Sequence, residues 1–204
     1  SLNAEIAMNA NKTELTIVGI SPEDGLSYTY TSGGSVEERT IIAKSGQTLT
    51  WKDITCTTTN IFGLTSGDGT VVFDNAICNA PQLVYMAKGN LILNNAVITL
   101  AGQELAQITN VTFGGSVTVN KTEYGGTSVI WSENDGEIRV KNGADVTIVT
   151  EGYFNYNVGS DVNFIMEDNS SFNLTTNSNS FTYETHTIVT FSVGNNCHFS
   201  FNNN

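Results

Sequence analysis

One ten-residue pattern occurs twice in the middle of the chain, and it restricts the fold more than any other feature. The segments VVFDNAICNA (71–80) and LILNNAVITL (91–100) lie twenty residues apart and align position by position. Each has an apolar run, two polar residues and a second run of alternating character. A unit this short cannot bury its apolar face alone, so we expect neighbouring units to stack on one another.

The same unit extends through most of the chain. Pairs of apolar residues separated by one position recur at steps of 20 to 27 residues, and each pair predicts the first strand of a unit. These pairs are Leu49/Trp51, Val71/Phe73, Leu91/Leu93, Val117/Val119, Ile138/Val140, Phe164/Met166 and Phe191/Val193. A short polar break and a second alternating strand follow most of them. Alternation places apolar side chains on the inner face of each strand and polar side chains on the outer face.

A third, less regular strand is expected in each unit, at 61–65, 83–87, 105–109, 128–132 and 153–158. Three short strands per unit predict an all-β chain folded as a parallel β-helix of about seven turns, with one domain over residues 1–204. A β-sandwich of short strands is the alternative. The β-helix is favoured because a small residue directly follows the polar break in several units, as if in one column: Ala76, Ala96, Ala144, Ser170 and Cys197.

The polar breaks are predicted to be corners between strands. Asn75, Asn95 and Asn142 should occupy stacked corners, and one residue of each corner should adopt the left-handed backbone conformation that Asn and Gly tolerate. Cys56 and Cys78 fall at the same inward position of neighbouring turns, one strand spacing apart. That spacing permits a disulfide, but two buried thiols that act as small apolar side chains are the favoured interpretation.

The charge of the chain excludes two classes of partner. The formal net charge is −12, and only 8 residues are Lys or Arg. Nucleic acid and anionic lipid surfaces both require clustered cations, so neither is an expected partner. The sequence also lacks the run of about 18 apolar residues that a membrane span requires, so no membrane insertion is expected.

The densest acidic segment is a candidate calcium site. Glu133, Asp135 and Glu137 alternate in the segment SENDGE as the ligands of a calcium loop do. The EF-hand pattern is not met, and a solvated turn is the favoured interpretation. We therefore expect no cofactor, with calcium as the alternative.

No catalytic residue is predicted. A polysaccharide lyase would need a basic residue near carboxylates that bind calcium. Arg139 is expected to point outward between Asn163 and Thr118, away from an acidic cluster. A hydrolase would need a pair of carboxylates, and a widely spaced pair is still open at this stage.

Four aromatic residues of the third-strand region are candidate ligand-binding residues: Tyr85, Trp131, Tyr153 and Tyr156. If they face outward, their flat rings can pack against sugar rings. Burial of some of them in the core is the favoured alternative, since large aromatic side chains are buried on average.

Several stretches resemble a known family: NKTELTIVG (11–19), NAPQLVYMAKGNLILNNAVITL (79–100), NVTFGGSVTVN (110–120) and GEIRVKNGADVTIVTEGYFNY (136–156). They are similar to the pectate-lyase-like adhesive domains of Gram-positive bacterial surface proteins, and they span most of the chain in the expected order. The resemblance implies a right-handed parallel β-helix, an extracellular location at the cell wall and an adhesive or scaffold role. The family's usual start lies before residue 5, which predicts that the chain is a fragment of a longer surface protein.

Together these features predict a non-catalytic module for cell-surface adhesion or scaffolding. Its partner would be a protein or a glycan on a host or neighbouring cell. The alternative is a carbohydrate-binding protein or a polysaccharide lyase-like enzyme that acts on glycans. Because the ends of a β-helix leave strand edges unpaired, end-to-end self-association is a further expectation.

Overall fold

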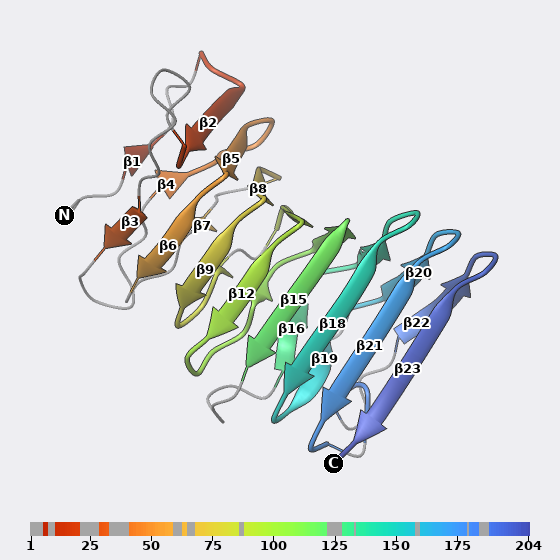
Figure 1. Cartoon of the computed structure of the whole chain (residues 1–204). Coiled ribbons are helices and arrows are strands. Elements are labelled where there is room, and N and C mark those ends of the chain that lie inside the picture. Colours follow the sequence, from red (N-terminus) through yellow and green to blue (C-terminus); the bar gives the residue numbers. More distant parts are fainter. Residues whose placement is uncertain are drawn as a thin grey trace.

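Three parallel β-sheets enclose one elongated core in the computed structural model of the chain (Figure 1). The structure describes residues 6–7, 11–20, 29–32, 41–58, 63–64, 68–85, 88–121, 128–132, 134–157, 160–178, 180–183 and 188–204. These residues contain no helix, and therefore none that could cross a membrane. Each turn adds one strand to each sheet and the chain winds in the right-handed sense, so the predicted parallel β-helix is confirmed.

Sheet 1 contains the short third strands of the turns, in the order β1-β4-β7-β10-β13-β16-β19. Its strands are β1 (Ile6–Ala7), β4 (Ile41–Ile42), β7 (Gly63–Leu64), β10 (Val84–Tyr85), β13 (Ala106–Gln107), β16 (Ser128–Ser132) and β19 (Tyr153–Asn157). All five predicted third-strand segments contain one of these strands. The sheet widens along the coil, because its strands lengthen from two residues to five.

Sheets 2 and 3 have eight strands each. Sheet 2 contains β2 (Glu14–Val18), β5 (Thr48–Lys52), β8 (Thr70–Asp74), β11 (Asn90–Asn94), β14 (Asn110–Gly114), β17 (Gly136–Val140), β20 (Val162–Met166) and β22 (Ile188–Val193). Sheet 3 contains β3 (Thr29–Ser32), β6 (Thr55–Thr58), β9 (Ile77–Ala80), β12 (Val97–Leu100), β15 (Ser116–Lys121), β18 (Asp145–Thr150), β21 (Ser171–Thr176) and β23 (His198–Asn203).

Inward side chains stack in columns along the axis of the coil. Leu49 pairs with Val71, Val71 with Leu91, and Leu91 with Val111, and all four side chains are buried. Successive strands of a sheet lie about 4.8 Å apart, so each apolar side chain is covered by the same position of the turns before and after it. Full burial of one such side chain contributes about 1.5–3 kcal/mol to folding.

One predicted strand assignment is wrong. Val117 and Val119 do not continue the column of Leu91 and Ile138, because they lie in β15 of sheet 3. Val111 takes that place in sheet 2, in register with Leu91 on one side and Ile138 on the other. Both segments alternate Val with polar residues, and Gly114-Gly115 between them is a corner rather than the start of a strand.

The corners between sheets 2 and 3 stack as predicted. Asn75 and Asn95 have φ angles of 51° and 48°, and the corner of Asn142 has its left-handed residue at Gly143, with φ of 69°. Side-chain amides link successive corners. The Nδ2 of Asn75 donates to the Oδ1 of Asp53 at 2.7 Å, and the Nδ2 of Asn169 donates to the Oδ1 of Asn142 at 3.3 Å.

The asparagine corners give way to two glycines at Gly114-Gly115. A Cβ atom on Gly114 would lie 2.4 Å from the Oδ1 of Asn94, and one on Gly115 would lie 2.1 Å from the Oδ1 of Asn95. Gly115 also has a φ of 61°, which side-chain-bearing residues rarely adopt. The two asparagine side chains of the preceding turn therefore occupy the space that a side chain at either position would need.

Cys56 and Cys78 are buried free thiols in the core, as expected. They are direct register partners in β6 and β9, and their sulfur atoms lie 3.1 Å apart. The hydrogen bond to Cys56 and the burial of the site raise the pKa of the Cys78 thiol far above its usual range. The Cys78 thiol is therefore protonated, and both side chains pack as small apolar groups.

Candidate functional site

A column of aromatic and amide residues follows the axis of sheet 1. The register of its strands aligns Leu64, Tyr85, Gln107, Trp131 and Tyr156 in that order. Three of the four predicted aromatic candidates therefore lie on one line of backbone positions, with Gln107 between the first and the second. The side chain of Tyr85 lies outside the described part of the structure.

The described rings of this region form one connected cluster. The ring centroids of Trp131 and Tyr156 lie 4.8 Å apart, and those of Tyr156 and Tyr183 lie 4.9 Å apart. Tyr153, the fourth predicted residue, joins the cluster through Tyr183 at 5.1 Å. All four side chains are half-buried, whereas the neighbouring Phe154 is fully buried in the core. We call Trp131, Tyr153, Tyr156 and Tyr183 the aromatic cluster.

Sequence reasoning missed Tyr183. It follows an irregular segment rich in Ser and Asn, and no alternating pattern places it in a strand. In the structure its backbone N–H donates to the carbonyl oxygen of Asn155 at 3.1 Å, and Thr182 forms an isolated bridge with the same residue. This backbone contact to β19 holds the ring against Tyr153 and Tyr156, and the sequence contains no local signal for it.

The indole N–H of Trp131 is shielded from solvent and has no hydrogen-bond acceptor within the described structure. A shielded indole N–H usually has a partner, because leaving it unpaired costs free energy.

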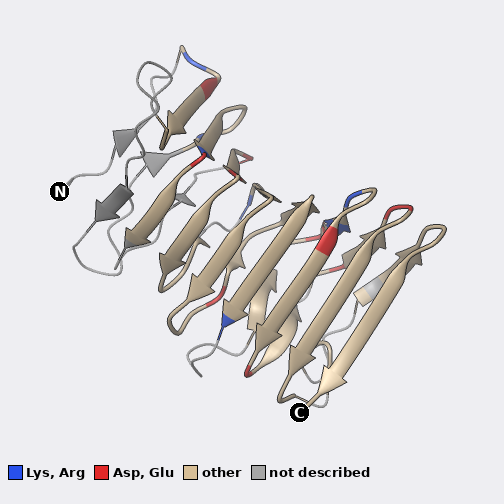
Figure 2. Cartoon of the chain, viewed as in Figure 1, with Lys and Arg blue, Asp and Glu red and all other residues tan. Residues whose placement is uncertain are grey.

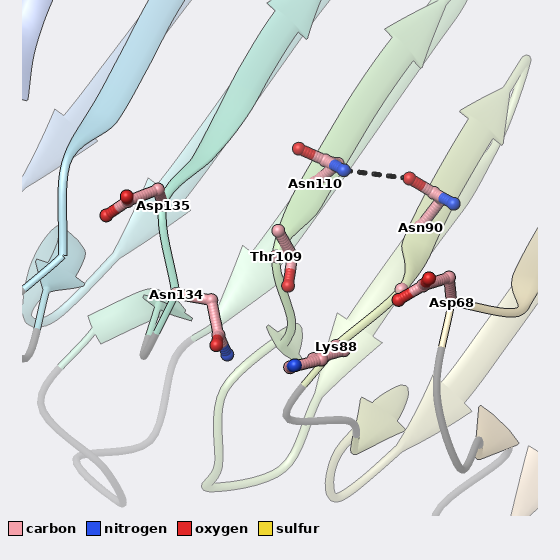
Figure 3. Close-up of a pocket in the computed structure, with 8 residues that line it drawn as sticks. Asp68, Lys88, Asn90, Thr109, Asn110, Asn134 and Asp135 are labelled. Carbon is pink, nitrogen blue, oxygen red and sulfur yellow. Dashed lines mark hydrogen bonds between the residues drawn. The ribbon is translucent and has the colours of Figure 1, made fainter.

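A polar groove of about 370 Å³ lies at the corner where sheet 1 passes into sheet 2 (Figure 3). Its lining comes from four successive turns of the coil: Asp68, Lys88, Gly89, Asn90, Thr109, Asn110, Asn134 and Asp135. Each of these residues lies at the start of a sheet 2 strand or just before it. Stacking of the turns therefore brings them into one row.

A ladder of side-chain amides forms one wall of the groove. The Nδ2 of Asn90 donates to the Oγ1 of Thr70 at 3.2 Å, and the Nδ2 of Asn110 donates to the Oδ1 of Asn90 at 2.9 Å (Figure 3). The Oδ1 of Asn110 in turn accepts the backbone N–H of Glu137 at 2.9 Å. These bonds orient the carboxamides, so the groove presents fixed polar groups at one-turn spacing.

The predicted calcium ligands point to different partners. Asp135 is exposed, and its Oδ1 accepts the backbone N–H of Asp161 at 2.8 Å. Glu137 instead binds Arg139, and Glu133 lies outside the described residues. Within the described part of the chain, no three His, Cys, Asp or Glu side chains form a group that could hold a metal ion.

The predicted neighbours of Arg139, Asn163 and Thr118, are wrong. Its register partners are Thr112 and Ile165, because Thr118 belongs to sheet 3 and Asn163 pairs with Glu137. Two carboxylates also bind the guanidinium, which contradicts the expectation that Arg139 lies away from acidic residues. The Nε of Arg139 lies 2.6 Å from the Oε1 of Glu137, and its Nη1 lies 2.8 Å from the Oε1 of Glu167.

The electrostatics of this site favour the charged forms of Arg139 and Glu167. The hydrogen bonds that the guanidinium donates to Glu137 and Glu167 raise the pKa of Arg139 above its usual value. The hydrogen bond from Arg139, and a second one from the backbone N–H of Asn142, lower the pKa of Glu167. A guanidinium held in this way is a structural ion-pair partner and is not a candidate for removing a proton from a substrate.

Two buried charges lie on the opposite side of sheet 1, where sheet 3 passes into it. Lys121 is fully buried and Glu104 is 7 % exposed. Burial lowers the pKa of Lys121, and the nearby charges of Glu104 and Glu151 partly offset that effect. Burial raises the pKa of Glu104, and Lys121 partly offsets that effect. We interpret the pair as structural, since Lys121 has no surface through which a ligand could reach it.

Comparison with known proteins returned no match. No family model, no curated protein and no solved structure matches this chain. The resemblance to adhesive domains of Gram-positive surface proteins therefore stays a prediction from the sequence.

Proposed function

We propose that the chain is a non-catalytic adhesion module that binds a neutral glycan along the outer side of sheet 1. The aromatic cluster is the observation that carries this proposal. Sugars present apolar C–H faces that pack against aromatic rings, and hydroxyl groups that bind amides and carboxylates. The half-buried cluster supplies the first kind of contact, and the polar groove supplies the second.

The cluster and the groove are close enough to act on one ligand. Thr109 follows Gln107 by two residues, and Asn134 follows Trp131 by three. An extended chain spans at most about 3.6 Å per residue, so the Cα atoms of each pair lie within about 11 Å. A polymer that runs parallel to the coil axis would meet the groove on the turns of Asp68 to Asp135 and the aromatic cluster on the turns of Trp131 to Tyr183.

The negative charge of the chain and of the groove favours a neutral glycan over an acidic one. The chain has a formal net charge of −12, and the groove contains Asp68 and Asp135 against a single cation, Lys88. A polyuronate or another anionic polymer would be repelled by this field. The same argument speaks against a nucleic acid as the partner.

The ion-paired state of Arg139 supports a non-catalytic role, since a guanidinium bound to two carboxylates is a poor base for a lyase mechanism. The proposed location is the outer side of a Gram-positive cell wall, and it rests on the sequence resemblance alone. At a cell surface a β-helix can serve as a spacer, because turns can be added without changing the contacts of distant turns.

The experiment is a glycan array with neutral and acidic polysaccharides, followed by titration of the retained glycans with isothermal titration calorimetry as the readout. We expect retention on neutral glycans, and Trp131→Ala should weaken binding at least about tenfold, equivalent to about 1.4 kcal/mol. Ile77→Ala is the matched control, because it removes an apolar side chain that is 51 % exposed on sheet 3.

Two results would reject the proposal in different ways. A folded chain that is retained on no glycan does not bind sugars through this face. Formation of an unsaturated product from polygalacturonate in the presence of Ca²⁺ would show a lyase, contrary to the non-catalytic role.

A further inference from the structure

The outer face of sheet 3 is a regular array of exposed side chains. In the strands from β6 to β21, buried residues alternate with exposed or half-exposed ones, and the strand register aligns the latter into two columns. The first column contains Thr55, Ile77, Val97, Thr118, Thr147 and Asn173. The second contains Thr57, Asn79, Thr99, Asn120, Val149 and Thr175. We call these residues the sheet 3 array.

The side chains of the array are short, uncharged and mostly β-branched. Six of them are Thr, three are Ile or Val, and three are Asn. Rotation about χ1 is restricted in Thr, Val and Ile, so these side chains lose little freedom when a partner binds. Within the described part of the chain no hydrogen bond engages the six Thr hydroxyl groups, which are therefore available to water.

The array differs in charge from the outer face of sheet 2. On sheet 2, Arg139 binds two glutamates, and the Nζ of Lys52 lies 3.8 Å from the Oδ2 of Asp74. Figure 2 shows the strands of sheet 3 largely free of acidic and basic residues. The exposed exception is Asp145, which lies at the start of β18 and outside the two columns. The array is therefore a neutral surface on an acidic molecule.

The positions of the array form a flat lattice. Neighbouring strands lie about 4.8 Å apart, and alternate residues of one strand lie about 6.6 Å apart. Most sheets twist by roughly 20–25° per strand, which would disrupt such a lattice within a few rows. In Figure 1, which views this face, the strands from β6 to β21 lie side by side in one layer with little change of direction. The array therefore repeats in two perpendicular directions.

A crystalline partner with matching repeats would make the same contact at each position of the array. Water molecules on the prism faces of hexagonal ice repeat at similar distances in two perpendicular directions. A Thr hydroxyl can donate to one water and accept from another, and the Thr methyl group orders the water around it. The array thus has both the spacing and the chemistry that a layer of ordered water requires.

Other classes of partner fit the array less well. It has no aromatic ring on which a sugar could pack and no charge that would attract a mineral or a nucleic acid. Its aliphatic side chains, Ile77, Val97 and Val149, are too few for the apolar core of a protein interface.

We propose that the chain binds ice through the sheet 3 array. A chain adsorbed on a growing crystal blocks the addition of water where it lies, so ice grows only at a temperature below its melting point. This gap is the thermal hysteresis of the solution. The proposal does not rest on glycan binding, because the array and the aromatic cluster belong to different sheets. The two proposals can therefore fail separately.

The first test is the thermal hysteresis of single ice crystals in solutions of the 204-residue chain. We expect faceted crystals and a gap that widens with protein concentration. Thr99→Arg should remove most of the gap, because Thr99 lies between Asn79 and Asn120 in the second column, where a long side chain would hold the lattice away.

Thr50→Arg is the matched control for this test. Thr50 is half-exposed on the outer face of sheet 2, in register with Thr16 and Val72, so the same substitution leaves the array intact. This variant should keep the full gap. Circular dichroism spectra of both variants would show whether the β-structure is retained.

Partition into ice provides a second test that needs no hysteresis. A crystal grown slowly from a stirred solution excludes most solutes but incorporates proteins that bind its surface. We expect the unmodified chain and Thr50→Arg to be enriched in the ice, and Thr99→Arg to stay in the liquid.

Three results would overturn the proposal. A folded chain that produces no hysteresis and stays in the liquid does not bind ice. A gap that Thr99→Arg leaves unchanged places the contact on another face. Equal losses from Thr99→Arg and Thr50→Arg would show that the effect does not depend on the array.

Discussion

The early and late turns of the coil connect the same columns with corners of different length. Two residues separate Phe73 from Ala76, but five separate Met166 from Phe172. Phe73 and Met166 nevertheless belong to one inward column of sheet 2, and Ala76 and Phe172 belong to one inward column of sheet 3. We call residues 48–100 the tight turns and residues 136–203 the wide turns. The longer corners of the wide turns project from the coil in Figure 1.

Side-chain size in the first inward column of sheet 3 follows corner length from Ala76 onward. After Ile54 in the first tight turn, this column contains Ala76, Ala96, Val117, Val146, Phe172 and Phe199. In the tight turns the thiol pair of Cys56 and Cys78 shares the core with Trp51 and Phe73 of sheet 2, whereas aromatic rings from all three sheets meet in the wide turns. A longer corner separates sheets 2 and 3 further at their shared edge, which leaves room for a ring. We infer that corner length determines core volume along this coil.

The largest loss of stability is expected from Phe172→Ala in the wide turns. The ring is fully buried and lies 5.2 Å from Phe154 and 5.1 Å from Phe164 between centroids. We expect the free energy of unfolding to fall by about 3–5 kcal/mol, as for other buried Phe residues replaced by Ala. Urea unfolding would measure it. A loss below about 1 kcal/mol would mean that the wide turns collapse onto a smaller core.

The reverse change tests the tight turns. Ala96 is fully buried and lies between Ala76 and Val117 in the same column. Ala96→Phe should cost about 1–3 kcal/mol, because the short corners cannot move apart to accept a ring. The same unfolding experiment measures it, with Ala96→Gly as a control that removes volume. A phenylalanine accepted at no cost would separate corner length from core volume.

The contrast between tight and wide turns also explains what the sequence could predict. Alternation and the asparagine corners predict the fold and most of the strands, because each depends on residues close together in the chain, but they misplace the strand of Val117 and Val119. The predicted single column of small residues is wrong. Ala144 and Ser170 precede the column of Ala76 and Ala96 by two positions, because the wide corners insert an extra inward residue.

The candidate site was less predictable than the fold. Alternating strands identified Trp131 and Tyr156 as candidates, since both lie in regular strands. Asp68, Lys88 and Asp135 lie in one row only because their turns stack in the observed order. With Val117 assigned to sheet 2 in place of Val111, the sequence alone would have aligned these residues differently. Tyr183 depends on a backbone contact made by an irregular segment, for which local sequence carries no signal.

A smaller effect is expected where tight and wide turns are alike, at the left-handed corner residue. Asn95 has a φ of 48° in a tight turn, and Gly143 has a φ of 69° in a wide turn. Asn95→Ala should cost about 1–2 kcal/mol in backbone strain, and it also removes the 3.1 Å bond between the Oδ1 of Asn95 and the N–H of Ser116.

Gly143→Ala should cost a similar amount of strain, since no heavy atom lies within 4 Å of the added Cβ position. Asn95→Gly is the control, because it keeps the conformation and loses only the side chain. Thermal unfolding midpoints would compare the three variants. Equal midpoints for Asn95→Ala and Asn95→Gly would show that the left-handed conformation is not strained here.

The smallest effect is expected from the ion pairs on the outer face of sheet 2. In the tight turns the Nζ of Lys52 lies 3.8 Å from the Oδ2 of Asp74, and in the wide turns the Nη1 of Arg139 lies 2.8 Å from the Oε1 of Glu167. The hydrogen bond from Arg139 lowers the pKa of Glu167 below its ordinary value, which is about 4.3 in unfolded chains. Its stabilisation is therefore complete above that ordinary value, and it is lost as the pH falls through the lower folded pKa.

Unfolding at pH 7 and pH 3 should show the difference. Because both side chains are about one-third exposed, we expect Glu167→Gln to cost at most about 1 kcal/mol at pH 7 and less at pH 3. Asp74→Asn in the tight turns is the control and should change little at either pH, since its partner is distant and exposed. An equal cost of Glu167→Gln at both pH values would mean that the carboxylate charge does not stabilise the wide turns. The corner would then depend on the hydrogen bond from the Asn142 N–H to Glu167, at 3.0 Å, which a glutamine can also accept.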